Sequence, residues 1–218
     1  MSFTYSGLKT AIQNYMDNTE STFTSTLDTF IQQAENRVFN SIELNVFRKN
    51  VTGTATSGNQ YLATPSDYIS PLSLSVLDSS SNYTFLLLKH PSFMRNYTQA
   101  ASTTGVPKYY AQFDDDTFIL GPTPNANLTF ELHYLYQPAS LTTTGDSGTT
   151  WVSKNAPDLL LYGSLVEASI FMKQDPSETA LFEQRFQENL IRLTTLIEGR
   201  ATRDENRFDR QRVMTRAS

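Results

Sequence analysis

Apolar residues recur at three- and four-residue steps in the first part of the chain, which is the spacing of helices that bury one face. This pattern predicts one helix over residues 5–17 and a second over residues 27–42. Ser25 and Asp28 have the spacing of a capping box, so the second helix is predicted to begin there. Turn-forming residues separate the two segments, and together they predict a helical hairpin.

The same spacing returns near the C-terminus. Asn155 and Pro157 open a third predicted helix, and the run Asp175-Pro176-Ser177-Glu178 opens a fourth. This run supplies a cap, a proline at the first position and an acidic side chain in the first turn. Gly199 is expected to end the fourth helix, because the apolar periodicity stops there.

Between the two helical parts the apolar period changes to two, which is typical of half-buried strands. The run Asp114-Asp115-Asp116 is expected to be the turn of a hairpin, and the low-complexity stretch Ser140–Lys154 to be a long exposed loop. The middle region therefore predicts about five or six antiparallel strands. They include residues 72–76, 83–89, 108–113, 117–120 and 128–136, with a short helix at 91–97.

These elements predict an α+β fold, in which a helical bundle of two N-terminal and two C-terminal helices carries an inserted antiparallel β region and an extended C-terminal tail. The expected helical domain consists of residues 1–45 and 155–199. The inserted β domain is expected at 46–154, and the tail at 200–218.

The net charge of −5 is unevenly distributed along the 218 residues. Residues 1–199 hold 11 Lys/Arg against 19 Asp/Glu, whereas residues 200–218 hold six Arg against three acids. Such an arginine-rich segment is suited to ordering against the carboxylates of a protein partner, and plain disorder or nucleic-acid binding are the alternatives. The arginines are Arg200, Arg203, Arg207, Arg210, Arg212 and Arg216.

The residues that catalysis or metal binding would need are scarce. The sequence has no cysteine and two histidines, His90 and His133, which are both expected at strand ends or surfaces. The oxygen-rich run 114–116 suits calcium, although acidic residues at a hairpin tip ordinarily form a solvated turn. No glycine-rich phosphate loop occurs. No enzyme activity, cofactor or resident metal is therefore expected.

The N-terminus lacks the basic start and apolar run of a secretory signal, and no later stretch has the length of a membrane span. A soluble product made in the cytoplasm, with no membrane partner, is therefore expected. Four tyrosines of the predicted strands have two alternative roles: a stacking platform for sugar or nucleic acid, or core and subunit interface, which the sequence favours. They are Tyr109, Tyr110, Tyr134 and Tyr136.

The order of elements, together with five local segments, resembles the head-to-tail adaptor proteins of tailed bacteriophages, including the tail tubular protein A and tail accessory factor types. These segments follow one another as strand, proline turn, aromatic strand, loop and returning helix. The segments are Gly105–Tyr110, Phe118–Pro124, Leu132–Pro138, Trp151 and Ala156–Ala168.

The resemblance implies a structural virion protein of the phage neck or tail. In such proteins a helical bundle forms a ring beneath the portal protein, the β region faces a tail tube or nozzle protein, and twelve subunits match the portal. The lumen continues the DNA channel without binding DNA specifically, and an acidic body is expected to repel passing DNA.

The resemblance also implies a role for each end of the chain. The C-terminal segment is expected to dock on the portal through Arg200, Arg203, Arg207, Phe208, Arg210 and Arg212. Subunit or tail interfaces are expected at Tyr109, Tyr110, Tyr134, Tyr136 and Trp151. Two rivals are a different neck component, such as a tail terminator, and a carbohydrate-binding or hydrolytic tail module.

Overall fold

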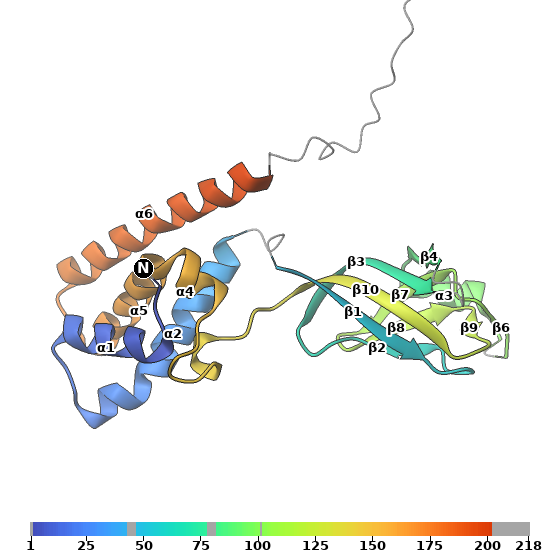
Figure 1. Cartoon of the computed structure of the whole chain (residues 1–218), viewed down its shortest axis with the longest axis horizontal. Coiled ribbons are helices and arrows are strands. Elements are labelled where there is room, and N and C mark those ends of the chain that lie inside the picture. The colour runs from blue at the N-terminus through green and yellow to red at the C-terminus, as the bar shows by residue number, and fades with distance from the viewer. Residues whose placement is uncertain (1, 43–46, 78–81, 101, 202–218) are drawn as a thin grey trace, which may run out of the picture. The chain divides into compact units, whose positions relative to one another are not determined.

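The computed structural model describes residues 2–42, 47–77, 82–100 and 102–201 and has the predicted α+β composition (Figure 1). The chain divides into two compact units, and each is described by itself. One unit is made by residues 1–43 together with 139–218, and the other by residues 44–138. The extended tail predicted at 200–218 lies outside the described residues beyond Ala201.

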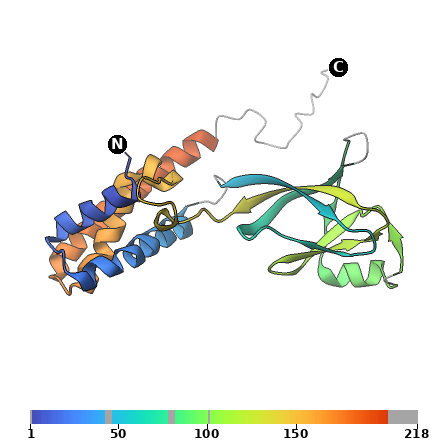
Figure 2. The same cartoon turned by 60° about the horizontal axis from the view of Figure 1, so that its bottom comes forward.

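The helical unit is built around one helix, α5, which packs against α1, α2 and α6. Figure 2 shows these helices running beside one another. Nine residues of α5 between Leu159 and Ser169 are buried, and they face several directions, as expected of a central helix. The helices of this unit are α1 (Tyr5–Met16), α2 (Ser21–Ser41), α4 (Trp151–Asn155), α5 (Pro157–Phe171) and α6 (Pro176–Ala201), with a 3-10 turn η2 (Leu141–Thr143).

The predicted start of α6 is confirmed, and the predicted start of α2 is wrong. Asp175 accepts a hydrogen bond from the backbone N–H of Ser177 at 2.8 Å, as an N-cap should. Helix α2 instead begins at Ser21, so Ser25 and Asp28 lie inside it. The Asp28 carboxylate accepts a hydrogen bond from the Tyr5 hydroxyl at 2.6 Å and thereby joins α2 to α1.

The predicted end of α6 at Gly199 is also corrected, because the helix continues to Ala201. A glycine in a helix interior lowers helix stability by about 1 kcal/mol relative to alanine, and this loss is too small to end the helix by itself.

The stretch predicted as an exposed loop of the β domain, Ser140–Lys154, belongs to the helical unit instead. Leu141 is fully buried, and its N–H donates to the Glu35 carboxylate at 2.9 Å. The carbonyl of Gly148 accepts from the N–H of Tyr5 at 3.1 Å. Because these contacts hold the returning chain on α1 and α2, the β unit ends at Pro138 rather than at 154.

The β unit contains two four-stranded sheets, in the orders β1-β10-β3-β4 and β2-β8-β7-β5, and a separate β6-β9 pair. Residues from both four-stranded sheets form one core, which includes Leu74, Phe118 and Phe130. The short helix α3 (Pro91–Tyr97) lies against β7 and β8. The strands are β1 (Arg48–Ala55), β2 (Tyr61–Ala63), β3 (Tyr68–Leu77), β4 (Tyr83–Phe85), β5 (Leu87–Leu88), β6 (Thr104–Gly105), β7 (Tyr109–Asp114), β8 (Thr117–Gly121), β9 (Thr123–Pro124) and β10 (Leu128–Tyr136).

Two expectations for this region change. The single strand expected at 83–89 is two strands, because the N–H of Leu86 donates to Leu74 in one sheet and the N–H of Leu87 donates to Lys108 in the other. The region is also not purely antiparallel, since β5 pairs with β7 in parallel and β6 does so with β9. The hairpin of β7 and β8 forms as predicted, with Asp115 and Asp116 at its turn.

Candidate interaction surfaces

Two of the residues considered for catalysis or metal binding, His90 and Asp114, make local structural contacts. The ring Nδ1 of His90 accepts from the N–H of Ser92 and caps α3. Asp114 accepts from the N–H of Asp116 at 3.1 Å, which closes the hairpin turn. Within the described ranges, no three His, Asp or Glu side chains are grouped so that they could hold a metal ion.

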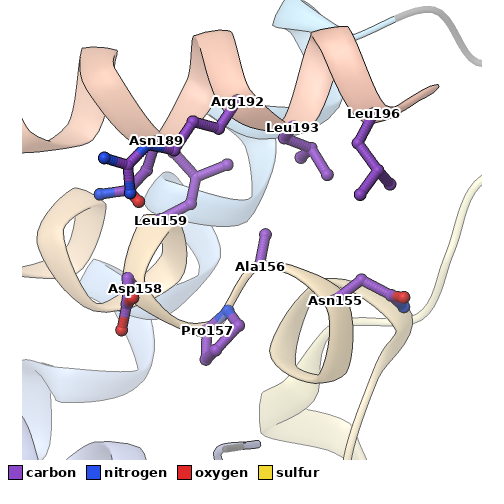
Figure 3. A pocket seen from close by; sticks show the side chains of 9 residues that line it. All are labelled: Asn155, Ala156, Pro157, Asp158, Leu159, Asn189, Arg192, Leu193 and Leu196. Carbon is purple, nitrogen blue, oxygen red and sulfur yellow. The ribbon is translucent and has the colours of Figure 1, made fainter. Parts of the chain in front are cut away.

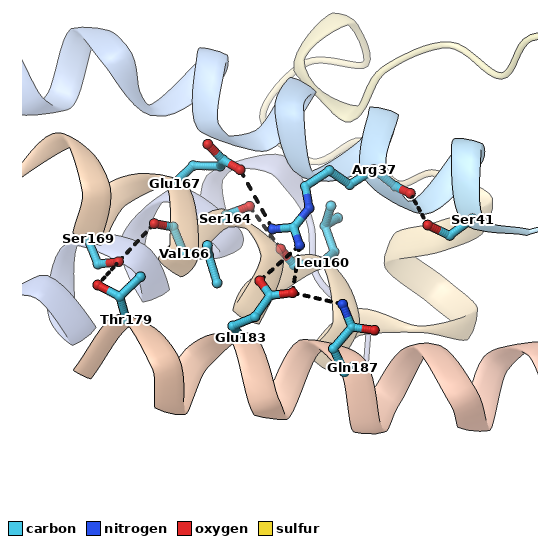
Figure 4. Close-up of polar contacts among 10 residues, drawn as sticks. All are labelled: Arg37, Ser41, Leu160, Ser164, Val166, Glu167, Ser169, Thr179, Glu183 and Gln187. Atoms are coloured by element: carbon cyan, nitrogen blue, oxygen red, sulfur yellow. Dashed lines mark hydrogen bonds and ion pairs between the residues drawn. The ribbon is translucent and has the colours of Figure 1, made fainter. Parts of the chain in front are cut away.

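An arginine on α2 fastens the helices of the helical unit together (Figure 4). Arg37 Nη2 donates to both carboxylate oxygens of Glu183 on α6, at 2.8 and 2.9 Å, and Nη1 lies 3.7 Å from Glu167 on α5. The guanidinium group also lies over the Phe186 ring, 4.4 Å from its centroid. One side chain of α2 is therefore joined to α6 by charge-assisted hydrogen bonds and stacking, and to α5 by a longer ion pair.

Glu183 is held as a carboxylate by these contacts. Its partial burial alone would raise the pKa, but hydrogen bonds from Gln187 and Arg37 and the arginine charge together lower the pKa below its ordinary value. Gln187 donates to Glu183 at 2.7 Å. The ionised form is therefore the one that fastens α6 to the bundle.

A small cleft of about 180 Å³ lies where α6 passes the junction of α4 and α5 (Figure 3). Leu159, Leu193 and Leu196 give it an apolar lining, and Asp158 and Arg192 give it opposite charges. This volume is below the usual range of small-molecule sites.

Two of the tyrosines expected at interfaces are core residues. Tyr110 is 3% exposed and Tyr134 is 1% exposed, and both belong to the core shared by the two sheets. Burial raises the pKa of Tyr134 to about 12, and its hydroxyl donates to Asp67 at 2.8 Å. The sequence left open whether these tyrosines lie in the core or at an interface, and the structure places Tyr110 and Tyr134 in the core.

The other three predicted interface aromatics are half-buried. Tyr109 contacts the rings of Phe93 and Tyr97 edge-on, at 5.2 and 4.9 Å between centroids. Tyr136 contacts Phe47 edge-on at 6.0 Å, and Trp151 begins α4. The five residues are divided between the units, since Trp151 belongs to the helical unit and the four tyrosines belong to the β unit.

The predicted portal-docking residues fall at the end of the described chain. Arg200 lies in the last turns of α6, and the structure places its backbone only. The remaining members of this set, Arg203, Arg207, Phe208, Arg210 and Arg212, lie outside the described residues.

The sequence interpretation missed the apolar surface at β4 and β5. Tyr83, Phe85, Leu87 and Leu88 are each more than half exposed, at 52%, 64%, 58% and 54%. Tyr83 and Phe85 stack with centroids 6.4 Å apart on the outer face of the first sheet. The signal in the sequence was the run Phe85–Leu88, where four consecutive apolar residues interrupt the alternation expected of one half-buried strand.

These features define a two-unit α+β protein with exposed apolar residues on helices and on strands, as in proteins that work by contacting other proteins. The family model described as the SU10 adaptor protein matches residues 3–215, so the chain belongs to that family. It is a phage adaptor-type structural protein and a component of the virion. Proteins of this class are not normally enzymes.

A search of the curated proteins found no match. In the part of the chain that the structure describes, no helix has both the length and the apolar character needed to cross a membrane.

Proposed function

We propose that this chain is a head-to-tail adaptor, whose copies form a ring beneath the portal protein, join the capsid vertex to the tail and continue the DNA channel. The observation that carries the proposal is the match to the SU10 adaptor protein over residues 3–215. This match covers both units and extends into the arginine-rich C-terminal segment. The partners are the portal, further copies of the chain and a tail tube or nozzle protein.

The helical unit is suited to lateral contacts within a ring. Its helices are tied by Arg37 and carry large exposed apolar side chains, such as Ile170 (59%) on α5 and Ile191 (66%) on α6. A stiff bundle loses little conformational entropy when it packs against a neighbour. In a closed ring each copy offers one surface to each of two neighbours, and twelve copies would match the portal.

The acidity of the chain is concentrated in the same unit. Residues 1–43 and 139–199 hold 13 Asp/Glu and 6 Lys/Arg, whereas residues 44–138 hold 6 and 5. We place the repulsion of DNA from the channel wall in the helical unit, because like charge keeps the phosphate backbone from adhering. A channel surface that proved basic would contradict this assignment.

The C-terminal segment is the proposed portal contact. Its six arginines, spread over residues 200–216, can each form bidentate hydrogen bonds with carboxylates of the portal. A segment that orders only on contact would keep the free chain from assembling before the portal is present.

The test is to mix the purified chain with the portal protein of the same phage and to examine the mixture by negative-stain electron microscopy and size-exclusion chromatography. We expect a ring on the portal. The matched control is a chain that ends at Ala201, which keeps α6 complete and should fold but not bind. Failure of the full chain to bind portal contradicts the adaptor, and undiminished binding by the shortened chain contradicts the docking role of the tail. Binding to a tail tube instead would favour a tail terminator.

A further inference from the structure

The segment from Tyr83 to Leu88 forms an edge of both four-stranded sheets. Strand β4 is the last strand in the order β1-β10-β3-β4, and β5 is the last in the order β2-β8-β7-β5. Figure 1 shows β4 at the rim of the β unit. Among the described strands, none pairs with the outer side of β5.

The backbone of β5 is directed so that another strand can pair with it. The N–H of Leu87 donates to Lys108 at 3.0 Å, and the N–H of Lys89 donates to Tyr110 at 2.8 Å, both on the β7 side. In an extended chain the backbone groups of successive residues point to opposite sides, so the N–H and C=O of Leu88 point away from β7. Such an edge is a template for an added strand.

The Leu88 side chain lies on the core face of its sheet and is nevertheless exposed. It is in register with Tyr110 on β7, whose side chain is buried in the core. Leu88 itself is 54% exposed, because no described strand covers it from outside. Strand β5 is short and is followed by Lys89, which are features that limit unspecific pairing at an edge, yet it exposes two leucines. An added strand would extend the core over Leu88.

The charge beside β5 is opposite in sign to that of the chain as a whole, whereas β4 has an acidic neighbour, because Glu131 lies beside Tyr83. No Asp or Glu occurs from residue 79 to residue 113, whereas Lys89, Arg95 and Lys108 all lie in that range and are exposed. A cationic edge favours an acidic occupant. It disfavours the C-terminal segment of the chain itself, which has a net charge of +3 over residues 200–218.

We propose that the outer edge of β5 binds an extended, acidic segment of another virion protein, which joins the sheet as a strand beside Leu88. Main-chain hydrogen bonds to Leu88 supply affinity, an apolar side chain of the segment packs on Leu88, and its acidic groups lie beside Lys89 and Lys108. The assignment of this segment to the tail-side protein rests on the proposed head-to-tail function. The expectation that the segment is acidic is independent of that function.

The decisive variant is Leu88→Pro. It removes the outward N–H and leaves the two β5–β7 hydrogen bonds from Leu87 and Lys89 in place, a position at which an edge strand tolerates proline. The probes are overlapping synthetic peptides covering the tail proteins of the same phage, tested against the free full-length chain by fluorescence anisotropy. We expect the peptides that bind to be acidic and Leu88→Pro to weaken binding about tenfold, the worth of one or two hydrogen bonds.

Two further variants separate the side-chain and charge contributions. Leu88→Lys keeps the N–H but opposes burial of the side chain, so it should weaken the same peptides and tests the edge even if the proline variant fails to fold. The double variant Lys89→Glu, Lys108→Glu should abolish binding of acidic peptides. The matched control is Leu181→Ala on α6, which removes an apolar side chain of the other unit that is as exposed as Leu88, at 54%, and should leave binding unchanged.

The proposal is overturned if no acidic peptide binds, if the Leu88 variants bind as the wild type does, or if the edge pairs instead with a second copy of the chain. The assay does not contain portal, so its failure is distinct from failure of the adaptor function. If both proposals hold, Leu88→Pro still forms rings on the portal and fails to recruit the tail-side protein.

Discussion

The helical unit and the β unit differ in where their charged and apolar side chains lie. In the helical unit, acids outnumber bases by 13 to 6, and the guanidinium of Arg37 lies between α2, α5 and α6. The β unit is nearly neutral and exposes leucines at the edge of a sheet. If both proposals hold, the two units divide the work: the helical unit repels the anionic DNA backbone, and the β unit keeps an edge open for a protein strand.

The largest expected effect tests whether each unit depends on its own core. Phe186 is 1% exposed in the helical unit and Phe118 is fully buried in the β unit. Truncating a buried phenylalanine to alanine costs about 3–5 kcal/mol. We expect Phe186→Ala to accelerate hydrogen exchange in α2, α5 and α6 and leave the strands unchanged, and Phe118→Ala to do the reverse. Equal acceleration in both units by either variant would show that they unfold as one.

A smaller effect is expected where charge fastens the helices. Arg37→Ala removes the bidentate contact to Glu183 and the stacking on Phe186, and we expect it to lower the free energy of unfolding by about 1–2 kcal/mol. The measurement is urea denaturation followed by circular dichroism at the helical wavelength.

The matched control is Arg185→Ala on α6, the helix to which Arg37 of α2 is bound. Arg185 pairs with Glu188 within α6 at 3.3 Å and is 55% exposed, so its loss should change stability by less than about 0.5 kcal/mol. If the two alanine variants were equally stable, Arg37 would be an ordinary surface residue rather than the fastening of three helices.

The sequence predicts elements well where the cause is local. The start of α6 follows from Asp175 and Pro176 alone, because the cap is made by neighbours in the chain. The start of α2 cannot be predicted in this way, because Asp28 does not cap its own helix and instead accepts a hydrogen bond from Tyr5 of α1. Likewise the loop at 140–154 is placed by the buried Glu35 and by the N–H of Tyr5, which are contacts that no local pattern encodes.

For the candidate surfaces, the sequence identifies which residue types are present but does not determine which face of a strand each side chain lies on. Adjacent tyrosines 109 and 110 necessarily point to opposite faces of β7, and the pattern alone leaves open which of them is buried. The exposed edge at Leu88 depends on two sheets meeting at Leu86, where the chain changes its hydrogen-bonding partner. Burial at such a junction follows from topology and not from periodicity.

The smallest expected effect concerns pH, and here the two units respond with opposite sign. Glu35 in the helical unit is 2% exposed, and its Oε2 has no hydrogen-bond partner in the described structure. Burial raises the pKa of Glu35, more than the hydrogen bonds from Ser140 and Leu141 lower it. In the β unit, burial would raise the pKa of Asp67, but hydrogen bonds from Lys49 and Tyr134 lower it below its usual value.

A carboxyl whose pKa is higher in the folded state than in the unfolded state favours folding while protonated, so its contribution is lost as pH rises above 4.5. A carboxyl with a lowered folded pKa contributes above 3.8, and its contribution is lost as pH falls below that value. Glu35→Gln stays neutral and still accepts from Leu141. We therefore expect its free energy of unfolding to increase relative to that of the wild type as pH rises from 4 to 7. Asp67→Asn should instead lose stability relative to the wild type as pH rises toward 3.8 from below, because the wild-type carboxylate contributes only once it is ionised. Unfolding free energies measured at each pH would contradict this if both differences ran in the same direction, because the two carboxyls would then share one environment.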